Sequence, residues 1–314
     1  MGESGSDVVV VALYHFAPME ALKELQVRLL EQCTRAEIQG TLLLAGEGIN
    51  GTIAGDDDGV ETVLAFLRAQ PGLGNLEHKR SFCSRNPFHR MKVRLKREIV
   101  TMGDDEIDPT RRVGTYVDPT DWNEIISDPE VIVVDTRNDY EVRIGTFDGA
   151  VDPGLVSFRE FPEWAKTHLD PQRTPKVAMF CTGGIRCEKA SSLLLREGFS
   201  EVLHLRGGIL AYLAETEEVD SMWNGECFVF DQRVALDADL KPGEHRLCFG
   251  CQEPVSKKER ESSNYEEGVT CPRCHTRTSD EERRQRRERV QQVERARARG
   301  ERHIGGPMPG RVSC

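Results

Sequence analysis

The cysteine at position 181 has the sequence context of a reactive thiol. Cys181 ends a short apolar run, residues 177–180, and precedes a loop that contains two adjacent glycines and ends at Arg186. A helix-like stretch, residues 188–197, follows the loop. A strand, a tight loop and a helix N-terminus in this order direct backbone N–H groups and the helix dipole into one concavity. A thiolate or persulfide held there has a lowered pKa, whereas most buried free cysteines are inert. The pattern predicts a catalytic Cys181 whose negative charge Arg186 stabilises.

A second group of cysteines has the spacing of a metal site. Cys248 and Cys251 form one C-x2-C pair, and Cys271 and Cys274 form another, with 19 residues between the pairs. Four thiolates in two such pairs suit tetrahedral Zn²⁺ at about 2.3 Å from each sulfur. Because four cysteines close the coordination shell, we expect a structural zinc ion that takes no part in catalysis. A disulfide-bonded pair and a degenerate site remain the alternatives.

Composition and charge exclude several classes of protein. The chain has 314 residues, enough for two or three domains, with 38% hydrophobic and 30% charged residues. It has no run of 18 apolar residues and no secretory signal at its start, so we expect no membrane span and no export. Ten cysteines without an export signal favour reduced thiols in the cytoplasm over disulfides.

The charge is unevenly distributed along the chain. The formal net charge of −11 argues against a general nucleic-acid binder. Residues 280–314 hold ten arginines and six acidic residues, so the remainder of the chain carries −15. A basic tail on an acidic body is compatible with an RNA partner but does not establish one. We expect residues 280–314 to be an Arg-rich, disordered tail, with a solvated helix over residues 280–302 as the alternative, because the segment contains too few apolar residues to form a core.

Apolar periodicity predicts an α+β domain over residues 1–105. Its order is β-α-β-β-α-β, typical of a ferredoxin-like or acylphosphatase-like domain with two helices on an antiparallel sheet. The expected strands are residues 8–13, 39–44 and 49–54, with a last strand at 76–82 or 91–95, and the helices begin near residues 18 and 56. Along residues 91–97, a period of two places Lys92, Arg94 and Lys96 on one strand face. This face is either a contact surface for a phosphate backbone or an ordinary solvated surface.

A second α/β domain is predicted over residues 128–222, and residues 106–127 are predicted to be a linker and the entry to this domain. Strands at 131–134, 177–180 and 202–205 alternate with helices at 157–169, 188–197 and 209–214, which favours a parallel sheet. Ligands of such sheets bind at the carboxyl ends of strands. Cys181 follows one such end and Asp135 closes another, so we expect Asp135 to support the site. A small cysteine-rich module, residues 223–279, completes the predicted organisation.

Five segments together resemble a known enzyme family. They are residues 46–55, 91–102, 135–141, 180–189 and 223–231, and the resemblance extends over about residues 8–279. Residues 180–189 resemble the active-site loop of rhodanese-related proteins, and the combination is similar to the rhodanese-domain tRNA uridine(34) hydroxylases. The resemblance implies an acylphosphatase-like domain, a rhodanese domain and a cysteine-rich region. It further implies oxygen-dependent hydroxylation of the wobble uridine to 5-hydroxyuridine, tRNA as the partner at its anticodon region, and Cys181 as the persulfide-bearing cysteine.

Rival functions differ in what the active-site loop must hold. Phosphatases of related fold have five residues between cysteine and arginine, whereas four separate Cys181 from Arg186, a smaller cradle that suits one sulfur atom. A rhodanese-type sulfurtransferase with a persulfide on Cys181 is the main enzymatic alternative. A non-enzymatic tRNA-binding module is disfavoured by the intact Cys181 and Arg186.

The sequence leaves the oxidation chemistry open. It shows no haem or flavin signature and no triad of two histidines and a carboxylate, so we expect no organic cofactor. Attack of Cys181 on uridine C6 and a persulfide-derived species are both compatible with the residues. For Cys187 we expect packing in the core rather than a position facing Cys181.

Overall fold

A computed structural model describes residues 8–173 and 176–300 of the chain. It divides into two compact units, Met1–Gly243 and Glu244–Cys314. The sequence predicted that the cysteine-rich region begins at residue 223. Residues 223–243 belong instead to the first unit, partly because β11 (Trp223–Gly225) pairs with β8 (Gly145–Phe147). Within the described residues, no helix combines the length and apolarity that crossing a bilayer requires.

The first unit begins with a five-stranded sheet in the order β4-β1-β3-β2-β5. Neighbouring strands are antiparallel except β2 and β5, which are parallel. The elements are β1 (Val8–Phe16), α1 (Leu22–Arg35), β2 (Gln39–Ala45), β3 (Gly48–Gly55), α2 (Asp57–Arg68), β4 (His78–Cys83) and β5 (Met91–Leu95). The predicted ferredoxin-like, acylphosphatase-like domain is confirmed. Both candidates for its last strand form strands, at opposite edges of the sheet.

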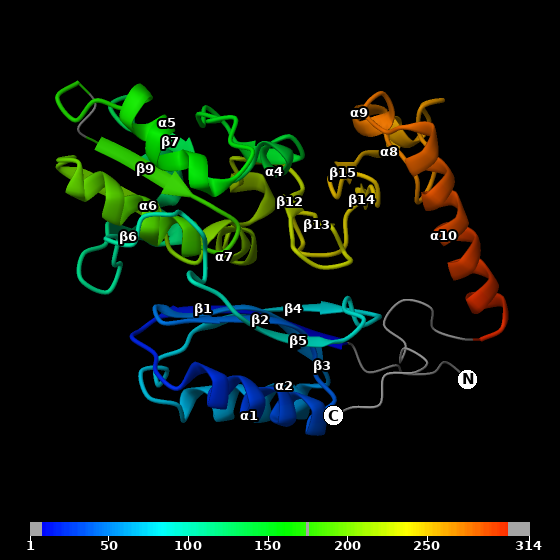
Figure 1. The fold of residues 1–314 in the computed structure, drawn as a ribbon. Coiled ribbons are helices and arrows are strands. Elements are labelled where there is room, and N and C mark those ends of the chain that lie inside the picture. The colour runs from blue at the N-terminus through cyan, green and yellow to red at the C-terminus, as the bar shows by residue number, and fades with distance from the viewer. Residues whose placement is uncertain (1–7, 174–175, 301–314) are drawn as a thin grey trace. The chain divides into compact units, whose positions relative to one another are not determined.

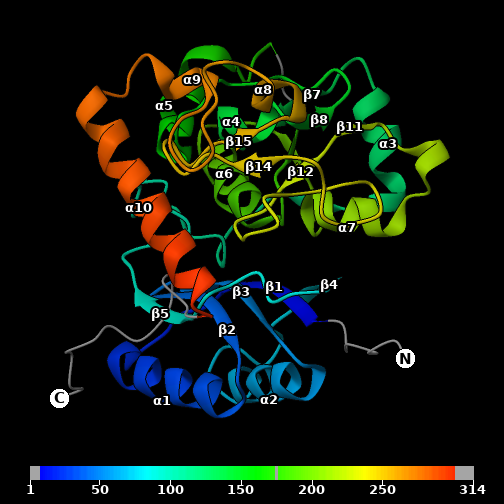
Figure 2. The same cartoon turned by 90° about the vertical axis from the view of Figure 1, so that its right-hand side faces the viewer.

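Successive side chains of each strand point to opposite sides of this sheet, so its two faces differ. Both helices cover one face (Figures 1 and 2), where Val11, Leu42 and Ile53 are fully buried in the core. Asp56 caps α2 by accepting a 2.6 Å hydrogen bond from the backbone N–H of Gly59. The residues between the core positions project from the opposite face, and they include Tyr14 of β1. This second face is available to contribute to a functional site.

A four-stranded parallel sheet forms the rest of the first unit. Its strand order is β6-β10-β9-β7, and the parallel pairing predicted for the second domain is confirmed. The strands are β6 (Thr115–Val117), β7 (Ile132–Asp135), β9 (Lys176–Phe180) and β10 (Glu201–Leu205). The helices that pack on the sheet include α3 (Pro119–Ser127), α5 (Phe161–His168), α6 (Ile185–Arg196) and α7 (Gly208–Glu215).

The segment predicted as a linker contributes to this second sheet. Strand β6 and helix α3 both lie within residues 106–127, the predicted linker and entry to the second domain, and the sequence predicted neither element. Strand β6 is short and pairs with β10, and Trp122 of α3 is fully buried against Phe147 and Phe180. A three-residue strand gives too little periodicity to be detected, because its pairing depends on a partner distant in sequence.

Two buried ion pairs join the second sheet to the first. Lys189 of α6 is 1% exposed, and its Nζ lies 2.8 Å from Oε2 of Glu47 and 2.7 Å from Oε2 of Glu98. Glu47 lies in the turn between β2 and β3, and Glu98 follows β5. Glu98 also accepts hydrogen bonds from the backbone N–H groups of Met102 and Gly103. One lysine near the active-site loop therefore ties the acylphosphatase-like sheet to the rhodanese-like sheet.

The second unit is small and contains a long helix. It comprises β14 (Arg246–Leu247), β15 (Pro254–Val255), α8 (Lys257–Arg260), α9 (Pro272–His275) and α10 (Asp280–Ala298). Of the two alternatives predicted for this segment, the structure supports the helix over disorder for residues 280–298. Ser279 and Glu282 form a capping box, and Arg286 and Arg287 bind the backbone of Val269 and the carboxylate of Glu266. These hydrogen bonds and ion pairs hold the helix in place, and amino-acid composition does not reveal them. Residues 301–314 lie outside the described residues.

Replacement of Lys189 by Met should destabilise the protein strongly. Loss of one partner leaves Glu98 and Glu47 without their buried cation, which costs about 3–5 kcal/mol. Urea unfolding followed by circular dichroism measures the difference. Lys176→Met is the matched control, because Lys176 and Glu130 form a surface pair at 3.9 Å whose loss costs about 0–1 kcal/mol. Equal losses in the two variants would contradict the role of Lys189.

Candidate active site

A cavity of about 620 Å³ lies between the free face of the first sheet and the loop that carries Cys181. The first sheet contributes Tyr14, Asn50 and Lys79, and the loop contributes Cys181 and Arg186. A third wall comes from residues 229–231 and from Arg233. Its size is within the range of small-molecule sites, roughly 300–1,000 Å³. The cavity is where a substrate could reach the predicted catalytic cysteine.

The loop backbone is arranged around the sulfur of Cys181. The thiol is 1% exposed, yet it borders the cavity, and its Sγ accepts a 3.1 Å hydrogen bond from the N–H of Gly184. The N-terminus of α7 holds the loop from behind, with the N–H of Ile209 donating to the Cys181 carbonyl at 3.0 Å. Gly208 has φ +67°, and a Cβ there would lie 2.3 Å from that carbonyl oxygen. Glycine is therefore required at position 208 for this close approach.

These contacts favour the thiolate form of Cys181. Burial opposes the charge, but a hydrogen bond from Cys187, the charge of Arg186 and the loop amides outweigh it and lower the pKa of Cys181 to about 5. The same surroundings act oppositely on the neighbouring thiol, since burial and the charge of Cys181 raise the pKa of Cys187. The surroundings therefore favour the thiolate at Cys181 and the thiol at Cys187.

Cys187 does not only pack in the core. It is fully buried, as expected, and its thiol lies 3.6 Å from the hydroxyl of Thr136. Cys187 also lies close enough to Cys181 to influence the pKa of its thiol.

The arginine that stabilises Cys181 is itself fixed by a carboxylate. Arg186 is 6% exposed and forms a bidentate pair with Glu141, at 2.6 and 2.8 Å. Burial alone would raise the pKa of Glu141, but the charge of Arg186 and its hydrogen bonds lower it. Glu141 was not singled out from the sequence. The only indication of Glu141 in the sequence was that it ends the segment 135–141, one of the five segments that resemble the hydroxylase family.

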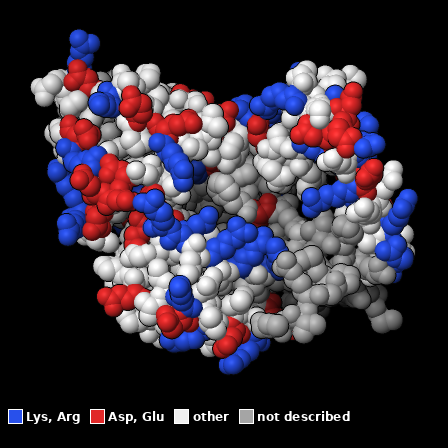
Figure 3. Space-filling view, viewed as in Figure 1, with Lys and Arg blue, Asp and Glu red and all other residues white. Residues whose placement is uncertain are grey.

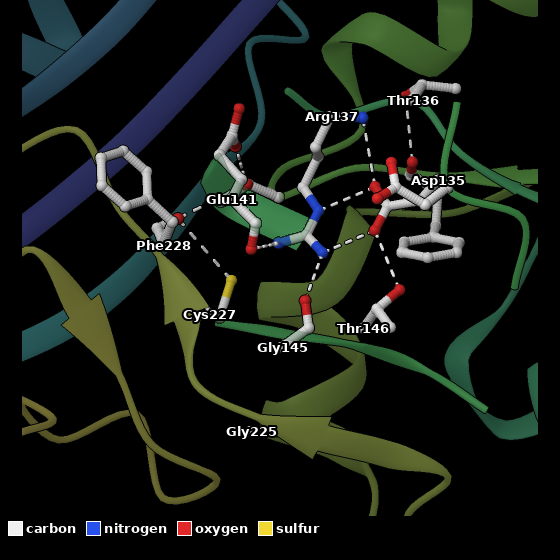
Figure 4. Close-up of polar contacts among 12 residues, drawn as sticks. Asp135, Thr136, Arg137, Glu141, Gly145, Thr146, Gly225, Cys227 and Phe228 are labelled. Atoms are coloured by element: carbon white, nitrogen blue, oxygen red, sulfur yellow. Dashed lines mark hydrogen bonds and ion pairs between the residues drawn. The ribbon is translucent and has the colours of Figure 1, made fainter. Parts of the chain in front are cut away.

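Asp135 lies further from the sulfur than the sequence suggested. Its carboxylate binds Arg137, at 2.6 Å for the shorter contact, and accepts a 3.0 Å hydrogen bond from Thr146 (Figure 4). Arg137 in turn donates to the carbonyls of Glu141 and Gly145. The described contacts of the Asp135 carboxylate are with Arg137 and Thr146. Asp135 therefore supports the short helix α4 (Asp139–Val142), which carries Glu141, and does not touch Cys181.

Two side chains from the first sheet reach the loop. The Tyr14 hydroxyl donates a 2.8 Å hydrogen bond to Glu188, and the Lys79 ammonium donates a 3.0 Å hydrogen bond to the Gly183 carbonyl. Burial raises the pKa of Glu188 and lowers the pKa of Lys79. Neither Tyr14 nor Glu188 was predicted as a site residue, since only the packing of distant strands against α6 brings them there.

The basic residues of β5 lie outside the cavity wall. Lys92 is half-buried, while Arg94 and Lys96 are exposed on the edge strand. In the parallel register, Lys92 and Arg94 lie beside Thr41 and Leu43, which do line the cavity. Figure 3 shows Lys and Arg side chains gathered on the face where β5 lies in Figure 1. The basic strand therefore borders the cavity.

The four cysteines of the second unit converge on one point. The Sγ atoms of Cys248, Cys251, Cys271 and Cys274 all lie within 4.8 Å of one another. Their closest pairs are 3.7–3.8 Å apart. A tetrahedron with metal–sulfur bonds of about 2.3 Å has edges of about 3.8 Å. The cluster can therefore bind a metal ion with tetrahedral geometry, and disulfides are absent from it.

Both sheets of the first unit belong to known domain families. Residues 8–99 match the family described as UPF0176 acylphosphatase like domain, and residues 118–215 match the rhodanese-like domain. The fold and the cysteine loop thus define a rhodanese-like protein with an acylphosphatase-like N-terminal domain.

Curated relatives narrow this class to one family. A protein named tRNA uridine(34) hydroxylase from Agrobacterium fabrum is 55% identical over 303 residues, with 96% of each chain covered. A Rhizobium etli protein of the same name is 57% identical over 298 residues, which cover 95% of this chain and 96% of the relative. The chain therefore belongs to the tRNA uridine(34) hydroxylase family.

The alkylation rate of Cys181 should report its lowered pKa. Thiolate is the reactive form, so the rate with iodoacetamide should fall as the pH drops through about 5 and be nearly constant from neutral pH upward. Mass spectrometry of the peptide containing Cys181 gives the rate at each pH. In urea the same thiol should titrate near the ordinary value of about 8.5. A folded-state midpoint near that value would contradict thiolate stabilisation by the loop.

Proposed function

We propose that this chain hydroxylates uridine 34 of tRNA at C5, with molecular oxygen as the co-substrate. The observation that supports this proposal most directly is the stabilised Cys181 sulfur at the wall of a cavity large enough for a nucleoside. The relatives named tRNA uridine(34) hydroxylase, at 55–57% identity over nearly the full chain, favour this activity over plain sulfur transfer. One oxygen atom enters the base, and the other leaves as water with two electrons from an external reductant and two protons.

Cys181 is the nucleophile in this proposal. Addition of its Sγ electron pair to C6 of uracil moves the C5=C6 pair toward C5 and O4, which makes C5 reactive toward an oxidant. After C5 gains oxygen, loss of the C5 proton and departure of the thiolate restore the ring. Arg186 and the Gly184 amide stabilise the sulfur when it is anionic, before addition and after departure. The alternative is that Cys181 carries a persulfide, whose negative charge the same loop would stabilise.

Positioning residues support this nucleophile. Glu141 fixes the guanidinium of Arg186, and Asp135 holds α4 through Arg137, so each acts on Cys181 only through another group. Lys92, Arg94 and Lys96 are proposed to contact the phosphate backbone of the tRNA near its anticodon. The three cations alternate along an exposed edge next to the cavity, a spacing that can follow a nucleic-acid strand. A tRNA substrate supports a cytoplasmic location as part of this proposal.

We also propose that the four-cysteine cluster holds one structural Zn²⁺. Its sulfur separations match a tetrahedral zinc shell, and the four thiolates occupy every position. Cys271 and Cys274 lie at the start of α9, and Thr278 donates a hydrogen bond to the Cys274 carbonyl just before α10 begins. Zinc would therefore stabilise the base of α10.

The substitution Cys181→Ala should abolish 5-hydroxyuridine in cellular tRNA. Without the sulfur no covalent or persulfide chemistry can begin at C6, while the small side chain preserves the loop. Nucleoside mass spectrometry of a deletion strain complemented with each variant measures the modification. Cys83→Ala, at a half-buried cysteine of β4, should leave it intact. Unchanged 5-hydroxyuridine in the Cys181 variant, or thiosulfate-to-cyanide sulfur transfer without any effect on tRNA, would overturn the proposed function.

Metal analysis should find one zinc ion per chain in the purified protein. The change Cys251→Ser should remove most of it and make residues 244–300 sensitive to protease, because the fold of so small a unit depends on its metal. Cys83→Ser is the matched control and should retain the ion. A protein that contains no zinc, or that keeps it after Cys251→Ser, would refute the zinc site.

A further inference from the structure

One wall of the active-site cavity carries an exposed aromatic ring. Phe230 is 63% exposed and lines the cavity together with Cys181 and Arg186. The Arg186 guanidinium carbon lies 6.0 Å from the centre of the Phe230 ring. Single exposed apolar residues are common on proteins and need no explanation. Phe230 differs from such residues because its ring lies at the wall of the active-site cavity, close to the arginine that stabilises the sulfur. Its exposure therefore calls for a functional explanation.

The loop that presents Phe230 is firmly braced. It joins β12 (Cys227–Phe228) to β13 (Ala235–Leu236), and the Val229 N–H donates to the Val234 carbonyl at 2.9 Å. Val234 has φ +68°, a conformation that a β-branched residue rarely adopts. Such strain persists only where the surrounding contacts impose the conformation. The loop is therefore held in one shape although it leaves a phenyl ring in water.

Two further contacts attach the Phe230 loop to the first sheet. Asp231 binds Arg233 through both carboxylate oxygens, and Arg233 donates a 2.8 Å hydrogen bond to the Ser81 hydroxyl of β4. The N–H of Gln232 donates to the Pro87 carbonyl at 3.2 Å. Phe228 packs edge-on against Phe230, with ring centres 5.1 Å apart. These contacts attach the loop that carries Phe230 to the first sheet and to Phe228.

The charges around the ring suit a nucleotide. Arg80 and Arg233 line the cavity but are paired with carboxylates, Arg80 with Asp57 and Arg233 with Asp231. Among the described residues, no carboxylate forms an ion pair with Lys79, whose ammonium donates to the Gly183 carbonyl. Lys79 is thus a cation available to a phosphate or a carbonyl oxygen of a ligand. An aromatic platform beside such a cation is typical of sites for single-stranded RNA bases.

We propose that Phe230 is the platform on which the target base stacks when it enters the cavity, an inference that rests on the proposed function. The base must leave the stack of the anticodon loop to reach a buried sulfur, and stacking on Phe230 replaces the contacts it loses. A base that lies on Phe230 turns its other face toward the remaining cavity, where Cys181 lies. Nucleophilic addition at C6 proceeds through a ring face, so this orientation is the productive one.

RNA binding by the full-length protein tests the platform directly. Phe230→Ala should weaken binding of an anticodon stem-loop with uridine at position 34 by about tenfold, the effect of losing one stacked base. Phe230→Tyr should restore it. The same stem-loop with an abasic nucleotide at that position should bind the wild type and Phe230→Ala equally. Phe249→Ala is the matched control, because Phe249 is also 63% exposed but lies in the second unit.

A tryptophan at position 230 gives a second readout. Fluorescence of Phe230→Trp should be quenched by the uridine stem-loop and unaffected by the abasic one. Equal losses of affinity for both stem-loops, or no loss in Phe230→Ala, would overturn the platform. The proposed function is tested by a different measurement. It fails if cells that contain the wild-type protein lack 5-hydroxyuridine, whatever the binding experiments show. Unchanged thermal unfolding of the variants would exclude misfolding as the cause of any loss.

Discussion

The buried pair between Arg186 and Glu141 is the interaction on which the active-site loop depends. A guanidinium and a carboxylate that are both nearly inaccessible to water stabilise the fold little by themselves, but loss of either leaves the other uncompensated. Glu141 is held by α4, and α4 is held by Asp135 through Arg137. The charge next to Cys181 is therefore positioned by a chain of contacts that begins at the end of β7.

Residues in the first two turns of α6 both support the active-site cysteine and join the two sheets. Arg186 and Cys187 face the sulfur, whereas the next two residues face the first sheet, where Glu188 meets Tyr14 and Lys189 meets Glu98. Four successive residues of one helix thus serve the loop and the junction between the sheets. Because a helix turns about 100° per residue, consecutive side chains can reach such different neighbours.

Much of this arrangement could be predicted because it is encoded locally. Periodicity gave the main strands and helices of both sheets, and spacing alone gave Cys181, Arg186 and the four-cysteine cluster. What escaped prediction depends on contacts between distant segments: the pairing of β6 with β10, the partner of Arg186 and the platform at Phe230. The sequence left helix α10 undecided for a related reason, since arginines that look solvated in the sequence bind carbonyl and carboxylate groups of the preceding loops.

Strand β5 ends the first sheet on one side, and its charges have a consequence for solubility. An edge strand can pair with the edge of another copy and so begin aggregation, a hazard that proteins reduce with charged side chains. The exposed Arg94 and Lys96 would meet their own equivalents in such a pairing and repel them. Side chains suited to attract a polyanion therefore also oppose self-association through the sheet.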